Sequence, residues 1–302
     1  MSNIQAILAV VDPSTVAQPG VAKAARLARA FGARLELFIC DNSPALAADR
    51  YYAAEFCDAA RDGIRAGHFG QLATLAAPIR RQGVNVDTDV VFCDSLYAGI
   101  VGKVRDMRAD LVVKDTHYHG AIRRALFTNT DWHLIRECPA ALLLATPVTW
   151  RSLVRFAAAI DPGHTHDKPA VLDHELLMLT ERLAIGMRGD ARAVHVVPAH
   201  ANAGGPRERL ARQAELEAVT SQHPNFFGSV DLIDGVPVEA LPNYVIASAI
   251  DVLVMGAVAR SAVLGLLVGR TAEKVLDRTP CDILVWKPSQ LTAQLLAATR
   301  AA

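Results

Sequence analysis

The chain of 302 residues repeats one pattern twice, and this duplication limits its fold more than any other feature. Ile4–Ser14 reads IQAILAVVDPS and Leu153–Gly163 reads LVRFAAAIDPG, so both segments are apolar strands that end in Asp-Pro. Farther on, Asp110-Leu-Val-Val recurs as Asp251-Val-Leu-Val, and in both copies a Cys/Pro pair precedes a last apolar segment. Because these landmarks keep one order at a nearly constant separation, we predict two tandem domains of the same fold.

Short apolar segments alternate with helical segments in each copy. The predicted strands cover residues 4–11, 34–40, 86–92, 110–114 and 141–145, and then 153–160, 191–197, 229–233, 251–255 and 282–286. The predicted helices of the first copy cover residues 19–31, 47–82, 95–108 and 129–136. Strands that are apolar on both faces, alternating with helices, are typical of a parallel sheet covered on both sides. We therefore predict an α/β fold with two tandem doubly wound parallel five-stranded sheets, in domains 1–149 and 150–302.

Composition excludes several classes of protein. Lysine plus arginine and aspartate plus glutamate both number 31, so the chain lacks the basic excess of a nucleic-acid binder. No apolar run approaches the roughly 18 residues that a membrane span needs, and the N-terminus does not read as a secretory signal. The five cysteines form no C-x-x-C pair, which favours a reduced, cytoplasmic compartment.

The segment after the fourth strand of the second copy has features of a phosphate-binding loop. It reads Met255-Gly256-Ala-Val-Ala259-Arg260, and after an apolar stretch Gly269-Arg270-Thr271 opens a predicted helix over 271–278. A glycine at a strand end lets backbone N–H groups approach a phosphate, and a helix N-terminus favours anions. Ordinary strand-to-helix turns also use glycine, so the glycines by themselves leave both interpretations open.

Taken together, the repeat and this loop resemble the universal stress protein family in its tandem E-type form. The resemblance implies an adenine nucleotide α-hydrolase-like fold and, in the second copy, a site for ATP or ADP. Members that bind nucleotide carry G-x2-G-x9-G-[S/T] after the fourth strand. Gly256 and Gly269 match the first and third glycines, whereas Ala259 replaces the second glycine and Arg270 the hydroxyl residue. An arginine can itself bind phosphate.

The same resemblance implies how the base would be bound. Asp161 falls on the aspartate that contacts adenine, and Val196 and Met255 fall on positions that line the base. Ile160 and Thr271 complete the predicted nucleotide-binding set.

The first copy departs further from the family pattern. Lys114, His117 and Phe127 stand at the three glycine positions, and only Thr128 matches the hydroxyl residue. Thr128-Asn-Thr-Asp131 also predicts a helix N-cap, and Asp12 is an acceptor for backbone donors at its strand end. We expect no nucleotide in the first copy.

Two histidines offer a different chemistry. His117 and His119 are two residues apart on a predicted strand-end loop, and neutral imidazoles are good ligands for zinc and related metals. A solvated loop with incidental histidines explains the same pattern.

Three functions remain open from the sequence. The first is a stress-response regulatory protein that binds adenine nucleotide or another small molecule, with at most slow ATP hydrolysis. The second is a nucleotide-independent scaffold for an apolar metabolite or a protein, and the third is a metal-dependent slow ATPase. No G-x-S-x-G elbow or Walker A lysine is present, so no dedicated catalytic set is predicted.

The family resemblance also implies an assembly. The last strands of the two copies, Leu142–Ala145 and Ile283–Trp286, are expected to pair inside the chain, which then forms an internal pseudo-dimer. Such pairing covers two sheet edges. A homodimer of the whole chain is a further option.

Overall fold

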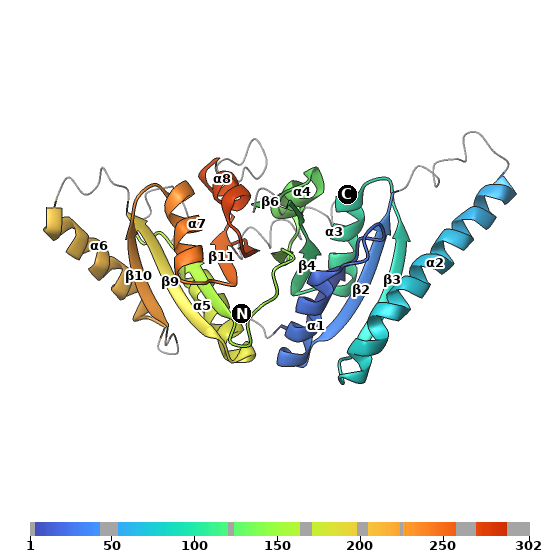
Figure 1. The fold of residues 1–302 in the computed structure, drawn as a ribbon, viewed down its shortest axis with the longest axis horizontal. Helices are drawn as coiled ribbons and strands as arrows, with labels where there is room; N and C mark the ends of the chain where they lie inside the picture. Colours follow the sequence, from blue (N-terminus) through green and yellow to red (C-terminus); the bar gives the residue numbers. More distant parts are fainter. Residues whose placement is uncertain are drawn as a thin grey trace. The chain divides into compact units, whose positions relative to one another are not determined.

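The computed structural model describes residues 4–42, 54–119, 124–163, 171–197, 205–223, 226, 228–257 and 270–288 (Figure 1). Contacts divide the chain into two compact units, Met1–Asp115 and Thr116–Ala302, which are described separately below. The domain boundary at 149/150 is inferred from the sequence repeat, whereas this division is based on contacts, so the domain boundary stays a prediction.

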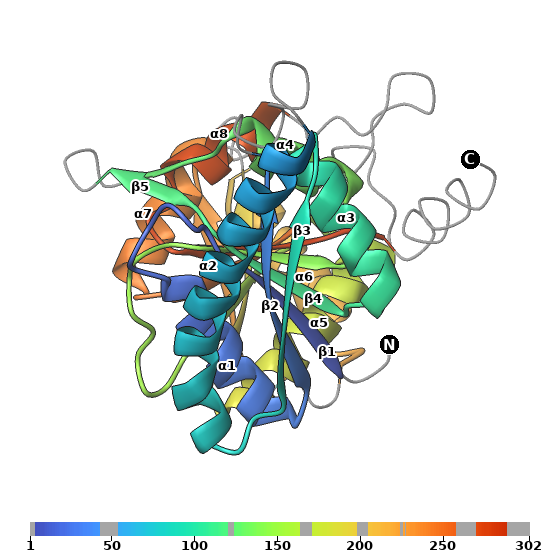
Figure 2. The ribbon, with the colours of Figure 1, turned by 90° about the vertical axis from the view of Figure 1, so that its right-hand side faces the viewer.

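The first unit is a parallel α/β sheet. Its elements are β1 (Ala6–Val10), α1 (Pro19–Phe31), β2 (Arg34–Asp41), α2 (Ala54–Arg81), β3 (Val86–Phe92), α3 (Leu96–Met107) and β4 (Leu111–Asp115). The strands pair in the order β3-β2-β1-β4, all parallel. With α1 and α2 on one face of these strands and α3 on the other, both faces are covered (Figure 2). This covering explains why the central strands are largely apolar, with Ile7, Leu8 and Leu37 fully buried.

The second unit contains the whole second repeat. Its elements are β5 (His117–His119), β6 (Arg124–Leu126), α4 (Asn129–Glu137), β7 (Ala141–Ala145), β8 (Arg155–Ala159), α5 (Val171–Met187), β9 (Asp190–Val197), α6 (Gly205–Thr220), β10 (Ser229–Asp234), α7 (Pro237–Ala247), β11 (Val252–Gly256), α8 (Arg270–Arg278) and β12 (Asp282–Trp286). Five strands run parallel in the order β10-β9-β8-β11-β12. The predicted α/β class and parallel strands are confirmed, and the predicted strand positions agree within two residues.

The last strand of the first repeat, β7, pairs with the last strand of the second. β7 runs antiparallel to β12, with Ile283 opposite Leu144 and Val285 opposite Leu142. The predicted pairing of these two strands is confirmed. It also explains why contacts assign β7 to the second unit although it belongs to the first repeat in sequence.

The prediction that His117 and His119 lie on a loop is wrong. Both residues are in β5, which pairs antiparallel with β6, His117 opposite Leu126 and His119 opposite Arg124. Strands of three residues are too short to show a clear alternation of apolar and polar residues, so the sequence did not reveal them.

The repeated aspartates that mark the duplication have one structural role in both copies. Asp110 Oδ2 accepts hydrogen bonds from the backbone N–H groups of Gln5 (2.8 Å) and Ala6 (3.0 Å). Asp251 Oδ2 accepts one from Arg155 N (2.9 Å). Each carboxylate therefore ties the start of the fourth strand of its copy to the start of the first.

Lys287 is a buried cation that follows β12. Its Nζ donates to the carbonyl oxygens of Cys138 (2.6 Å) and Leu134 (3.4 Å), at the C-terminal end of α4. Cations stabilise this end of a helix, where carbonyl groups lack partners. Burial lowers the pKa of Lys287 from 10.5 to about 8, against the opposing effects of Cys138 and Glu137.

This lowered pKa predicts a pH-dependent stability. Between pH 8 and about pH 10 the unfolded chain holds a proton at Lys287 that the folded chain has lost. Stability therefore rises with pH in this range, and below pH 8 the full cost of the buried charge is present. Relative to Lys287→Met, the wild type should gain about 1.4 kcal/mol of unfolding free energy per pH unit. Urea titrations at pH 7, 8, 9 and 10 measure this difference, and a difference independent of pH would contradict it.

Among the helices of the described ranges, none is both long enough and apolar enough to cross a bilayer.

Candidate functional site

The order of the strands reverses between β8 and β11 in the second unit. From β8 the chain proceeds through β9 and β10 on one side, and then returns to β11 and β12 on the other. Ligands of open α/β sheets bind at such a reversal, outside the carboxyl ends of the strands. Asp161 lies two residues beyond β8, and Gly256 is the last residue of β11. Because Ala158 is opposite Val254, both residues lie at the same edge.

Asp161 is held by two neighbours that the sequence did not single out. Its backbone N–H donates to Asp173 Oδ1 of α5 (3.2 Å), and Asp173 is buried. Its Oδ1 lies 3.9 Å from His195 Nδ1 of β9, and 17% of the Asp161 side chain is exposed. His195 Nδ1 also donates to the carbonyl oxygen of Ile160 (3.0 Å), since a carbonyl only accepts. The carboxylate is thus positioned with part of its surface open.

Three apolar residues of the predicted base-binding set are among the described residues. Ile160 and Met255 are buried and Val196 is partly exposed. A hydrogen-bond acceptor that is partly open, together with a few apolar side chains, is typical of sites for small molecules. Binding of adenine by these residues stays a prediction.

Gly256 has a packing role that does not depend on a ligand. A Cβ on Gly256 would lie 2.5 Å from Cδ2 of Leu172, the second residue of α5. Leu172 is buried, so it has little room to move away. Glycine is therefore required here for the approach of α5 to β11.

Part of the predicted site lies outside the described residues. Ala259 and Gly269 belong to this part, and for Arg270 and Thr271 only the backbone, at the start of α8, is described. The phosphate side of the site stays a prediction. The same holds for metal binding by His117 and His119, whose side chains are not described.

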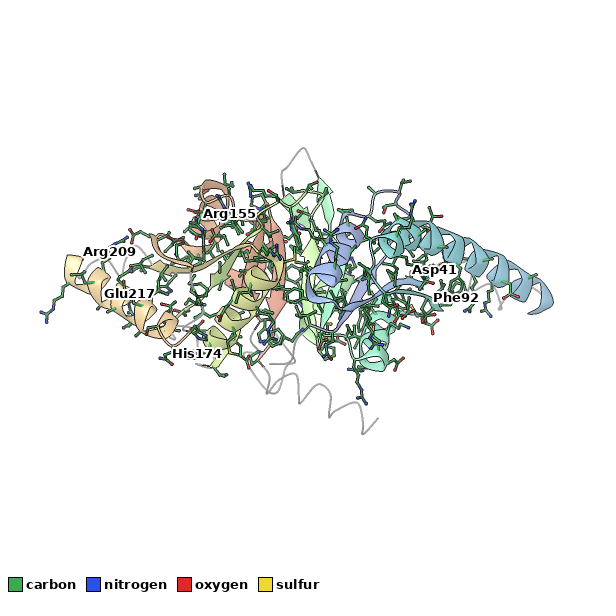
Figure 3. The ribbon with its side chains drawn as sticks, turned by 90° about the horizontal axis from the view of Figure 1, so that it is seen from below. Asp41, Phe92, Arg155, His174, Arg209 and Glu217 are labelled. Carbon is green, nitrogen blue, oxygen red and sulfur yellow. The ribbon has the colours of Figure 1, made fainter. Side chains whose placement is uncertain are left out.

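Within the described ranges, no group of three or more His, Cys, Asp or Glu side chains is arranged to hold a metal ion. One histidine pair is present: His174 Nδ1 of α5, labelled in Figure 3, lies 2.9 Å from His223 Nε2 beyond α6. Burial and the nearby His174 lower the pKa of His223.

A guanidinium also lies beside the loop that follows β8. Arg212 of α6 forms an ion pair with Glu215 (2.8 Å), and a Cβ on Gly163 would lie 2.7 Å from Arg212 Nη1. No sequence signal marks Arg212, because α6 carries many charged residues and only the tertiary structure shows which of them reaches this loop.

The strand register corrects the alignment of the first copy with the family motif. Ala9 is opposite Val113, and its counterpart in the second repeat, Ala158, is opposite Val254, so Val113 corresponds to Val254. Asp115, rather than Lys114, therefore corresponds to Gly256. The starts of α4 at Asn129 and of α8 at Arg270 give the same offset, so Thr128 rather than Phe127 corresponds to Gly269. The motif spacing alone had misplaced both positions by one residue.

In the first unit, the carboxylate of Asp115 lies at the strand reversal, where the second unit has Gly256. Its Oδ1 accepts a hydrogen bond from the backbone N–H of Gly20 (2.6 Å), in the first turn of α1. A Cβ on Gly20 would lie 2.7 Å from this oxygen. The first unit thus has glycine on the helix and a carboxylate on the strand, whereas the second has Leu172 on the helix and Gly256 on the strand. An N–H group that an anionic ligand could use in the first unit is already bound to Asp115.

The predicted N-cap at Thr128 is confirmed. Thr128 Oγ1 accepts from Asp131 N (3.2 Å), and Asp131 Oδ2 accepts from Thr128 N (2.7 Å), which is a capping box. The ring of Phe127 packs against Trp132 with centroids 5.4 Å apart. The predicted role of Asp12 as a local acceptor is also confirmed, since its Oδ1 accepts from Ser14 N (2.8 Å).

Known proteins share both the sequence pattern and the fold. The family model described as "Universal stress protein family" matches residues 3–145 and 171–287. "Universal stress protein E" of Escherichia coli K12 is 25% identical over 305 residues, which covers 96% of each chain. The protein of the same name from Photorhabdus laumondii is 24% identical over 315 residues, covering 99% of each.

Two solved structures have a similar fold. A functionally unknown protein from Pseudomonas aeruginosa PAO1 has a TM-score of 0.76 at 22% identity, covering 99% of this chain and 98% of that one. A universal stress protein from Archaeoglobus fulgidus has a TM-score of 0.69 at 12% identity, covering 95% and 99%. On the match of the family model to both repeats, the chain belongs to the universal stress protein family and carries two domains of that family in tandem.

Proposed function

We propose that the second domain binds an adenine nucleotide, ATP or ADP, and that the chain acts as a stress-response regulatory protein rather than a dedicated enzyme. The observation that supports this most is the position of Asp161 and Gly256 on either side of the strand reversal in a member of this family. The Asp161 carboxylate would accept a hydrogen bond from the exocyclic amine of adenine. Ile160, Val196 and Met255 would cover the base.

The phosphates are assigned to the segment between β11 and α8. Gly256, Ala259 and Gly269 would provide backbone N–H groups, and the start of α8 with Arg270 and Thr271 would provide a helix N-terminus and a cation. A bound nucleotide would supply negative charge at this edge. No base for hydrolysis is proposed, so any turnover of ATP would be slow.

Asp161→Ala tests this proposal, with Asp12→Ala as the matched control because Asp12 is its counterpart in the first repeat. Calorimetric titration with ATP and ADP should give one site per chain. Loss of a hydrogen bond to a charged group weakens binding by roughly tenfold to a hundredfold, so Asp161→Ala should bind that much more weakly. Asp12→Ala should bind like the wild type. Equal affinity of all three proteins for nucleotide would refute the assignment.

A second function is favoured by the packing of Gly256 against Leu172. Because this contact explains the glycine without a ligand, a nucleotide-independent scaffold for an apolar metabolite or a protein partner is the alternative. It predicts no calorimetric heat with millimolar ATP and a co-purifying small molecule or protein in mass spectrometry. A metal-dependent ATPase using His117 and His119, and a homodimer of the chain, stay predictions.

A cytoplasmic location is part of the same proposal. Among the described residues, Cys40, Cys93, Cys138 and Cys281 are in no disulfide, and three of them are buried. Buried cysteines outside disulfides are typical of proteins in reducing compartments.

A further inference from the structure

Two cysteines of the first unit meet at the carboxyl ends of neighbouring strands. Cys40 is the residue before the end of β2, and Cys93 follows the end of β3. Their sequence neighbours Asp41 and Phe92, both labelled in Figure 3, are opposite one another in the strand register. Cys93 N donates to Asp41 O (2.9 Å), which extends the ladder by one bond.

The two side chains point to the same face of the sheet. Cys40 is opposite Val91, and residues two apart on a strand, such as Val91 and Cys93, face the same side. That side is covered by α3. A Cβ on Gly99 of α3 would collide with Cys40 Sγ and lie 3.0 Å from Cys93 Sγ. The absence of a side chain at Gly99 therefore leaves the space that both sulfur atoms share.

The thiols differ in exposure. Cys40 is buried and Cys93 is partly exposed. Burial, followed by contact with the Cys93 thiol, raises the pKa of Cys40, so Cys40 keeps its proton. A thiol reacts with oxidants as the thiolate and only where the oxidant can reach it. The partly exposed Cys93 is therefore the sulfur that an oxidant would meet first, with Cys40 behind it.

We propose that Cys40 and Cys93 form a reversible disulfide when the protein meets hydrogen peroxide. The Cys93 sulfur attacks one peroxide oxygen and the O–O bond breaks. The hydroxide that leaves combines with the proton released by Cys93, which gives a sulfenic acid and water. The Cys40 sulfur then attacks the Cys93 sulfur, the S–S bond forms as the S–O bond breaks, and the departing hydroxide takes the proton of Cys40 as a second water.

The cross-link would join the ends of β2 and β3 and close the chain segment between them, which includes α2. Cys93 lies beyond the last residue of β3, so bringing the sulfurs to bonding distance leaves the β2–β3 pairing intact up to Phe92. The modification uses only residues of the first unit. Its success or failure is therefore independent of nucleotide binding by the second domain.

The test is a count of free thiols in denaturant after treatment of the folded protein with a small excess of hydrogen peroxide. The chain has five cysteines, and formation of the disulfide consumes two, so the wild-type count should fall from five to three. Cys93→Ser should stay at four. Cys40→Ser should fall from four to three, because its Cys93 is oxidised to a sulfenic acid that has no second thiol to react with. The control Cys57→Ser should fall from four to two, and dithiothreitol should restore the full count.

Two further measurements assign the bond without relying on the variants. Peptide mapping of the oxidised wild type should show one linked pair of peptides, containing Cys40 and Cys93, and a loss of two hydrogen masses. Dimedone should label Cys93 in Cys40→Ser, whereas it should leave Cys40 unlabelled in Cys93→Ser. Disulfides between chains, over-oxidised cysteines in place of a linked pair, or an equal loss of thiols in Cys93→Ser would overturn the proposal.

Discussion

Asp282→Ala should lower the free energy of unfolding of the second unit by about 3 kcal/mol or more, because each buried donor that loses its acceptor costs about 1–3 kcal/mol. Asp282, at the start of β12, is 1% exposed. Its carboxylate accepts from Thr146 N (2.8 Å), Thr146 Oγ1 (2.7 Å) and Trp150 Nε1 (2.7 Å). Alanine would leave these donors buried without an acceptor, and a buried donor without a partner is costly.

Urea unfolding followed by tryptophan fluorescence measures this loss. All three tryptophans of the chain, Trp132, Trp150 and Trp286, lie in the second unit, so the signal reports on that unit. Asp234→Ala is the matched control, because Asp234 forms a half-exposed ion pair with Arg209. The control should lose less than about 1 kcal/mol. A similar loss in both variants would show that the buried hydrogen bonds of Asp282 contribute little.

Gly256→Ala should lower the free energy of unfolding by about 1–3 kcal/mol, because an added methyl group in a filled core forces its neighbours to move. The added Cβ would meet Leu172, and this contact predicts a specific rescue. In a Leu172→Ala background the same change should cost close to nothing, since the shortened side chain leaves space for the methyl group. A double-mutant cycle in urea measures this coupling.

The same cycle separates packing from ligand binding. If Gly256 serves only to bring backbone N–H groups near a phosphate, its replacement should weaken ATP binding and leave stability unchanged, with no coupling to Leu172. Gly102→Ala in α3 is the control, because a Cβ there meets no atom within 4 Å. It should be neutral or stabilise the first unit by up to about 1 kcal/mol, as alanine favours a helix over glycine. Urea unfolding followed by far-UV circular dichroism measures the stability of this control variant.

Much of the fold could be predicted from the sequence because its signals are local. The apolar strands of the two repeats, and the helices between them, follow from residue patterns within short windows. The capping box at Thr128 and Asp131 is likewise encoded by residues three positions apart. The short strands β5 and β6 escaped prediction because three residues carry too little pattern.

The candidate site could be predicted only in part. Asp161 and Gly256 stand out because each lies at or just beyond the end of an apolar strand, next to a turn. Asp173, His195 and Arg212 come from other elements. Nothing in their local sequence indicates that the first two lie beside Asp161 or that Arg212 lies beside Gly163. The first copy shows the same limit, since motif spacing placed Lys114 where the register places Asp115.

The sequence by itself determined that this protein is a tandem α/β chain, and which residues end its strands. The tertiary structure decided which of these residues meet. Asp115 accepts a hydrogen bond at the start of α1, and Leu172 packs against Gly256. The sulfur atoms of Cys40 and Cys93 both lie next to Gly99, although more than fifty positions separate the two cysteines. The physical reason is that strand register and helix packing set these contacts. Both depend on hydrogen bonds and close packing between segments far apart in the chain, which no local window of sequence contains.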